Sequence, residues 1–202
     1  MMIRKRVNII LLLSILLMAS APDGTREVVV SLQPESSISI HGKSNINTFD
    51  FIQSGVFTEP SIKVSLNQNT QGLLTNSVSL PVDVRKFTCS NKKMLNDFLD
   101  LLNAEKYPVM NITVHKINVK TEKTSTDKDF YTGTVIVSIT LAGITSLYSV
   151  PFDAVSASDR FVILGEKILR FSDFKLTPPV KFMGLIKVKN ELHVQLKLVV
   201  EA

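Results

Sequence analysis

The sequence predicts an all-β fold, an antiparallel meander of eight or more strands with one helix inserted in it. Apolar and polar residues alternate with a period of two through most of the chain, as in strands with one buried and one solvated face. Turn residues interrupt this alternation at Tyr107-Pro108, Ala142-Gly143 and Pro178-Pro179. Strands with one apolar face each must form a barrel or a sandwich, and the periodicity does not distinguish the two.

The clearest strand covers residues 192–200, where aliphatic residues alternate with polar and charged ones. The same pattern occurs at residues 28–32, 38–40, 62–66, 78–84, 135–141 and 148–152. Between residues 110 and 119 the apolar phase shifts by one residue. This shift predicts a β-bulge near His115-Lys116, which would bend a long strand.

One segment, near residues 91–103, has the pattern of an amphipathic helix. Met94, Phe98 and Leu102 lie at intervals of four and share one face. Ser90 is the expected N-cap, and the helix must end before Pro108. A stripe of this kind packs into a core or lines a ligand site, and the spacing alone does not decide between them.

The N-terminus has the pattern of a secretory signal. Three basic residues precede an apolar run over residues 7–18, and Ala19-Ser20-Ala21 supplies small residues for cleavage. An uncleaved membrane anchor is the alternative, but the run is shorter than the ~20 residues that a spanning helix requires. We therefore expect a signal peptide over residues 1–21, one domain over residues 22–202, and a periplasmic or secreted location.

Composition argues against several functions. Three of the 23 Lys and Arg residues belong to the signal, so 20 remain against 18 acidic residues, a net charge of +2. This near-neutral balance disfavours nucleic-acid binding. The single cysteine, Cys89, excludes an internal disulfide, and we expect it to be unpaired and buried.

Catalytic and metal-binding motifs are missing from the sequence. It contains no nucleophile elbow, no Gly-rich phosphate loop and no histidine pair at metal-ligand spacing. His41, His115 and His193 lie far apart, each at a polar strand position. We therefore expect neither an enzyme nor a metal site.

Several stretches resemble the YceI-like family of bacterial lipid-binding proteins over about residues 27–201. They are residues 36–42 (SSISIHG), 91–110 (from NKKM to KYPVM), 131–135 (YTGTV), 141–145 (LAGIT), 173–179 (DFKLTPP) and 184–188 (GLIKV). This resemblance implies an extended, lipocalin-like barrel of eight antiparallel strands with the helix inserted, around an elongated apolar cavity that holds an isoprenoid chain.

The resemblance further implies a non-catalytic carrier for a quinone or polyprenyl lipid, with no covalent cofactor and with transient membrane contact. It implies no catalytic residues, and the oligomeric state stays open. The residues expected to line the cavity are Phe49, Phe51, Phe57, Met94, Phe98, Leu102, Tyr107, Ile112, Val137, Phe171, Phe174 and Phe182. The alternative is a fully packed β domain that acts through its surface, in protein–protein interaction or stress response.

Overall fold

The computed structural model describes residues 26–55, 61–69, 72–124, 128–157, 160–181 and 185–201. The elements are β1 (Arg26–Leu32), β2 (Ser37–Ser44), β3 (Thr48–Ser54), β4 (Ser61–Asn69), β5 (Gly72–Asp83), η1 (Val84–Lys86), α2 (Lys92–Leu101), β6 (Val109–Thr124), β7 (Asp129–Leu141), β8 (Ile144–Ala157), β9 (Arg160–Arg170), η2 (Phe171–Phe174), β10 (Val180–Lys181) and β11 (Ile186–Glu201). Strands hold more than half of these residues, and α2 is the one α-helix among them. The predicted all-β fold with one helix is confirmed.

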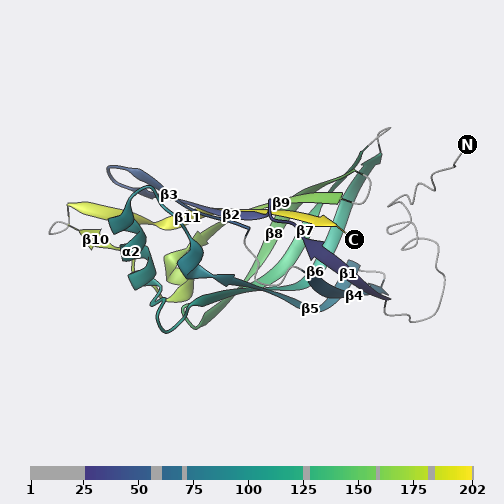
Figure 1. Ribbon diagram of the computed structural model, residues 1–202, viewed down its shortest axis with the longest axis horizontal. Coiled ribbons are helices and arrows are strands. Elements are labelled where there is room, and N and C mark those ends of the chain that lie inside the picture. Colours follow the sequence, from purple (N-terminus) through teal and green to yellow (C-terminus); the bar gives the residue numbers. More distant parts are fainter. Residues whose placement is uncertain are drawn as a thin grey trace, which may run out of the picture.

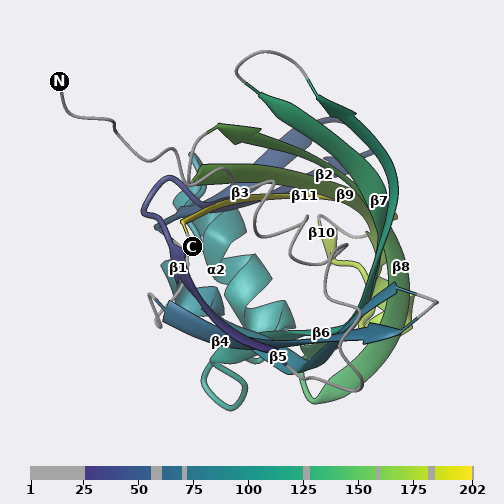
Figure 2. The same ribbon diagram turned by 90° about the vertical axis from the view of Figure 1, so that its right-hand side faces the viewer.

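Eight strands follow one another around a curled antiparallel sheet, in the order β1-β4-β5-β6-β7-β8-β9-β11. Two residue pairs between β1 and β11, Ser31 with Glu201 and Leu32 with Val200, join its ends. Figure 2 shows these strands around a common axis, with α2 at the far end. The eight-stranded curled sheet of the prediction is therefore present.

The β2–β3 hairpin extends this sheet at one end. Both β1 and β2 pair with the same side of β11, and β2 takes over at Ser37, opposite Lys197. On the side of β3 away from β2 there is no ladder among the described strands, only one isolated bridge, between Ile52 and Thr88. The wall is therefore only half closed here, and α2 lies at this end together with β3 and β10, away from β1 and β4 (Figure 1).

The helix packs through aromatic contacts. Phe98 is buried, with its ring stacked on that of Phe51 at 4.1 Å between centroids and edge-on to that of Phe87 at 5.9 Å. Its N-cap is Asn91, whose side-chain oxygen accepts a hydrogen bond from the Met94 N–H at 3.1 Å. The prediction of Ser90 as cap was wrong by one residue, because Asn caps a helix as well as Ser does.

The turns and the bulge follow the sequence signals. β7 and β8 are joined at Ala142-Gly143, whose φ values of 49° and 80° match the positive values that a type I′ hairpin turn requires. The pairing of β6 with β7 shifts register between Val114 and Lys116, so the predicted bulge is confirmed.

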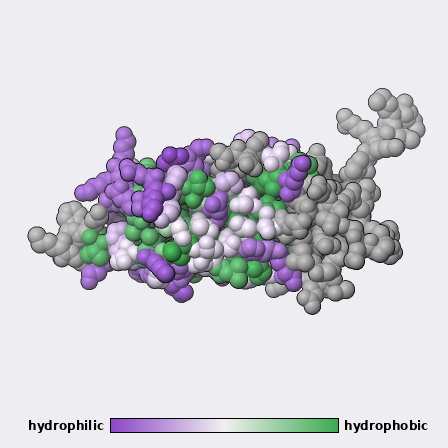
Figure 3. Space-filling model, turned by 90° about the horizontal axis from the view of Figure 1, so that it is seen from below, coloured by the Kyte–Doolittle hydropathy of each residue, from purple (hydrophilic) through white to green (hydrophobic). Residues whose placement is uncertain are grey.

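The surface seen in Figure 3 intersperses hydrophobic with hydrophilic residues. Cys89 is unpaired but only partly buried, packed beside the core. It was expected to be largely buried, but its exposure is intermediate, because it lies between the exposed Thr88 and the exposed Ser90, at the margin where α2 begins. In the part of the chain that the structure describes, no helix is long and apolar enough to cross a membrane.

Candidate ligand-binding site

Among the described residues, three of the hollows in the interior lie in series along the molecule. The first, here called the barrel cavity, measures about 280 Å³ and lies inside the curled sheet. The second, the neck, measures about 60 Å³. The third, the helix-end cavity, measures about 420 Å³ and lies between α2, β3 and the start of β11. Ligand pockets for small molecules typically span ~300–1,000 Å³. The helix-end cavity falls within this range, and the barrel cavity lies just below its lower end.

Strand periodicity makes the barrel cavity apolar. Alternate residues on one strand point to the same face, so the aliphatic phase of β7, β9 and β11 faces inward. Its wall includes Val135, Val137, Ile139, Val150, Phe152, Phe161, Ile163, Val194, Leu196 and Leu198. An eight-stranded barrel is the size at which the interior either fills with side chains or admits a small ligand. In this protein the side chains leave space.

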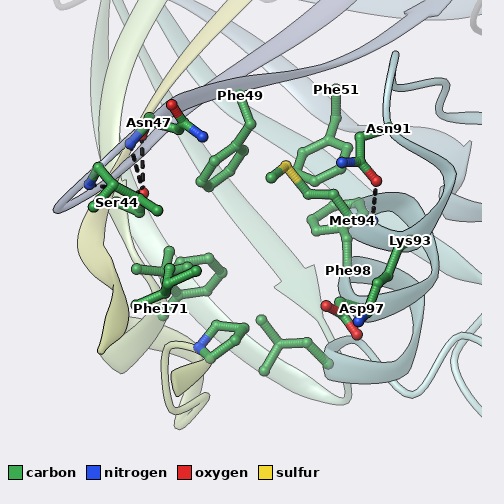
Figure 4. A pocket seen from close by; sticks show the side chains of 15 residues that line it. Ser44, Asn47, Phe49, Phe51, Asn91, Lys93, Met94, Asp97, Phe98 and Phe171 are labelled. Atoms are coloured by element: carbon green, nitrogen blue, oxygen red, sulfur yellow. Dashed lines mark hydrogen bonds between the residues drawn. The ribbon is translucent and has the colours of Figure 1, made fainter. Parts of the chain in front are cut away.

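Aromatic rings and the α2 stripe line the helix-end cavity. Figure 4 shows Phe49, Phe51, Met94, Phe98 and Phe171 around it. Polar groups stand at its margin, where the Asn47 N–H donates to Ser44 Oγ at 2.9 Å. The hollow thus combines an apolar wall with a polar rim.

The sequence-predicted residues divide among the hollows. Phe49, Phe51, Met94, Phe98 and Phe171 line the helix-end cavity. The neck is lined by Phe98, Leu102, Ile112, Phe171 and Phe174. Ile112 and Val137 line the barrel cavity. The predictions for Phe57 and Phe182 lie outside the described residues.

Tyr107 does not line any of the three hollows. Its ring lies against the β7–β8 turn, where a Cβ added to Gly143 would meet ring atoms at 3.0 Å. Tyr107 therefore packs against the turn, away from the three hollows in which the other described candidates lie.

Shared side chains separate neighbouring hollows. Phe98 and Phe171 border both the neck and the helix-end cavity. Ile112, Ile139 and Leu169 border both the neck and the barrel cavity. The expected elongated apolar interior is present in outline, but these side chains divide it into compartments.

Sequence reasoning missed most of the barrel-cavity wall, above all on β8 and β9. Phe161, Ile163 and Leu169 share one phase of β9, and this phase could have been read from the sequence. Lys167 belongs to the same phase. Among the described residues that line the barrel cavity, it is the only charged one.

Polar contacts near the cavities are few and local. The Tyr148 hydroxyl donates to Asp173 Oδ2 at 2.9 Å, and burial together with this carboxylate raises the pKa of Tyr148 to about 12. His41 contacts Asp50 at 2.6 Å on the exposed side of the β2–β3 hairpin. No group of three or more potential metal ligands occurs among the described residues.

Curled sheet, covering helix and apolar hollows together define a β-barrel binding domain. Residues 30–200 match the YceI-like domain family, and the chain belongs to that family. YceI-like domains form a family of binding proteins that are generally non-catalytic. No curated protein sequence gives a significant match.

Solved structures of other proteins share this fold, among them the following three. BcnA of Burkholderia cenocepacia aligns with a TM-score of 0.58 at 16% identity, over 81% of this chain and 95% of its own. A polyisoprenoid-binding domain from Saccharophagus degradans, implicated in plant cell wall breakdown, aligns with a TM-score of 0.57 at 12% identity. The alignment covers 86% of this chain and 98% of that domain. The Campylobacter jejuni YceI protein aligns with a TM-score of 0.50 at 15% identity, over 79% of this chain and 84% of its own.

Proposed function

We propose that this protein is a non-catalytic carrier or store for a long-chain isoprenoid lipid of the quinone or polyprenyl type. The barrel cavity carries the proposal, because its wall is almost wholly apolar and the neck and helix-end cavity continue it. Transfer of a prenyl chain from water into such a hollow gains ~0.8 kcal/mol per buried methylene. Carriage of this kind requires no covalent step. Family membership and the polyisoprenoid-binding relative support the same ligand class.

The N-terminal signal pattern supports a periplasmic or secreted location. Transient contact with a membrane is part of the proposal, since a carrier must collect and release its lipid. Beside the helix-end cavity, Ile46 and Leu185 leave 58% and 74% of their surface exposed. The Asn45 side chain joins these two segments by hydrogen bonds to the Leu185 carbonyl at 2.8 Å and the Lys187 N–H at 2.9 Å. They therefore form one apolar tip through which a lipid could be exchanged.

The first test is to identify what the exported protein retains. The full chain, produced with its signal and purified without detergent, would be examined by native mass spectrometry and by mass spectrometry of an organic extract. We expect an isoprenoid mass in wild type and in Lys92→Ala, whose changed side chain lies on the exposed face of α2. Val135→Phe, which places a ring in the barrel cavity, should retain little or none.

The proposal fails if the extract holds no isoprenoid and lipid-free protein binds no added polyprenol or quinone. Equal retention by wild type and Val135→Phe would place the lipid outside the barrel cavity. The Lys92→Ala control separates a cavity effect from a general effect of substitution.

A further inference from the structure

The barrel wall has a gap between β8 and β9. Their ladder runs only from Phe152 with Gly165 to Ala157 with Arg160. Beyond it, β8 stays paired with β7 back to Ile144, and β9 stays paired with β11 up to Arg170. Pro151 stands where the ladder ends, and proline has no N–H to donate to a neighbouring strand. Residues 144–151 and 166–170 therefore diverge, leaving what we call the β8–β9 gap.

Side chains, not a ladder, bridge this gap. At its wide end η2 intervenes, where the Ser146 hydroxyl donates to the Asp173 carbonyl at 2.7 Å. The Asp173 carboxylate also accepts hydrogen bonds from the Tyr148 hydroxyl at 2.9 Å and the Arg170 N–H at 3.2 Å. Nearer the ladder, Lys167 Nζ donates to the Ser149 carbonyl at 3.0 Å.

Lys167 occupies an inward-facing strand position, at which the alternating pattern would place an apolar residue. It is paired with Val194 on β11, and its neighbours in the same phase of β9 are Gly165 and Leu169. All of these residues line the barrel cavity. A lysine in such a wall keeps its methylene stem among apolar side chains and extends its ammonium toward water, here into the gap.

The wall is also thin at this point. Gly165 lines both the barrel cavity and an outer groove of about 530 Å³. Gly165 has no side chain to separate the two. Charged and polar residues, among them Glu166, Gln195 and Lys197, line the outer groove. An apolar interior and a polar exterior thus meet at Gly165, two residues before Lys167 on β9.

This arrangement suits an amphiphile. An ammonium has three N–H donors, and the structure gives the Lys167 group one protein acceptor, the Ser149 carbonyl. The remaining donors can meet oxygen atoms of a ligand. Lysine is a common phosphate ligand, acting as a compact positive charge. The nearby Asp173 carboxylate is already held by the Tyr148 hydroxyl and the Arg170 N–H.

We propose that the β8–β9 gap binds the anionic head group of the carried lipid, with Lys167 donating hydrogen bonds to its phosphate oxygens and the prenyl chain in the barrel cavity. This inference rests on the proposed function and narrows its ligand class. It selects prenyl phosphates over neutral prenols of the same chain length.

Two ligands with one tail test the inference. Geranylgeranyl phosphate and geranylgeraniol would each be titrated into four lipid-stripped proteins: wild type, Lys167→Met, Lys167→Arg and a control, Lys189→Met. Lys189 is an exposed lysine on β11. We expect wild type and Lys189→Met to bind the phosphate about tenfold more tightly than the alcohol. A tenfold difference in affinity corresponds to the free energy of one hydrogen bond to a charged group. Lys167→Met should bind both compounds with similar affinity while its affinity for the alcohol is unchanged. Lys167→Arg should keep a preference for the phosphate.

Each other outcome has a defined meaning. If Lys167→Met loses affinity for both compounds equally, Lys167 only fastens the wall, and the inference is overturned. No phosphate preference in wild type overturns the inference but leaves the proposed function standing. Wild type that binds neither compound overturns the inference, and it overturns the proposed function as well if no added quinone binds and the organic extract holds no isoprenoid. Inorganic phosphate at the same concentration should not compete, and competition by it would indicate a free-phosphate site instead of a lipid head-group site.

Discussion

Glycine determines how closely two strands approach at one point of the wall. A Cβ added to Gly133 on β7 would overlap the Asn118 carbonyl oxygen of β6 and the Phe152 ring of β8. A backbone oxygen cannot rotate away as a flexible side chain can. Any larger residue at Gly133 must therefore move the strands apart.

Gly133→Ala should lower the free energy of unfolding by about 1–3 kcal/mol, the usual cost of overpacking. Gly165→Ala is the matched control, because its added Cβ would meet the nearest atom, Val150 Cγ1, at an ordinary 3.5 Å. Since glycine within a strand is less stable than alanine, this control should be neutral or slightly stabilising. Urea denaturation of both variants checks the prediction, and equal midpoints would contradict it.

At the scale of elements, α2 begins at a defined residue. Asn91, not Ser90, has its side chain on the Met94 N–H, satisfying one of the free donors of the first turn. The helix has no acidic residue in that turn to supplement the cap. Its start therefore depends on one side chain.

Asn91→Ala should cost about 1 kcal/mol of stability, the typical value of an N-cap. Ser90→Ala, one residue earlier and exposed, should cost much less. Thermal unfolding followed by circular dichroism compares the two variants. If Ser90→Ala were the more destabilising, the cap would be the residue that the sequence first indicated.

Periodicity predicted the elements because each of its signals is local. The signals for the bulge near His115 and for the turn at Ala142-Gly143 each come from neighbouring residues, and both predictions were confirmed. The pairing of Ser31 with Glu201 joins opposite ends of the chain, and no local pattern contains it. The role proposed for Lys167 could not be predicted from the sequence for the same reason, because the β8–β9 gap depends on where β8 and β9 part.

The candidate site was predicted unevenly. Aromatic residues near α2, such as Phe51 and Phe98, were predicted to line a cavity because the helical stripe marks one face, and both border the helix-end cavity. The aliphatic wall of the barrel cavity was mostly overlooked, since Val and Ile in a strand look the same whether they fill a core or enclose a space. Only the arrangement of all the strands shows how much space remains.

The whole molecule distinguishes a hollow domain from a packed one. Val135 borders the barrel cavity, whereas Val82 on β5 is completely buried and borders none of the three hollows. Both are valines on strands of the same sheet. They therefore form a matched pair for the same substitution.

In lipid-free protein, Val82→Phe should lower the free energy of unfolding by about 1–3 kcal/mol, because the added ring has no space in a packed interior. Val135→Phe should change it by much less or raise it, because the ring fills an existing cavity and buries apolar surface. Denaturant titration of wild type and both variants, after removal of lipid by extraction and refolding, measures the difference. Equal destabilisation by the two substitutions would mean that the interior closes when empty and would favour a packed domain acting through its surface. A clear difference would mean that the hollow is built into the fold and that lipid enters a space already formed for it.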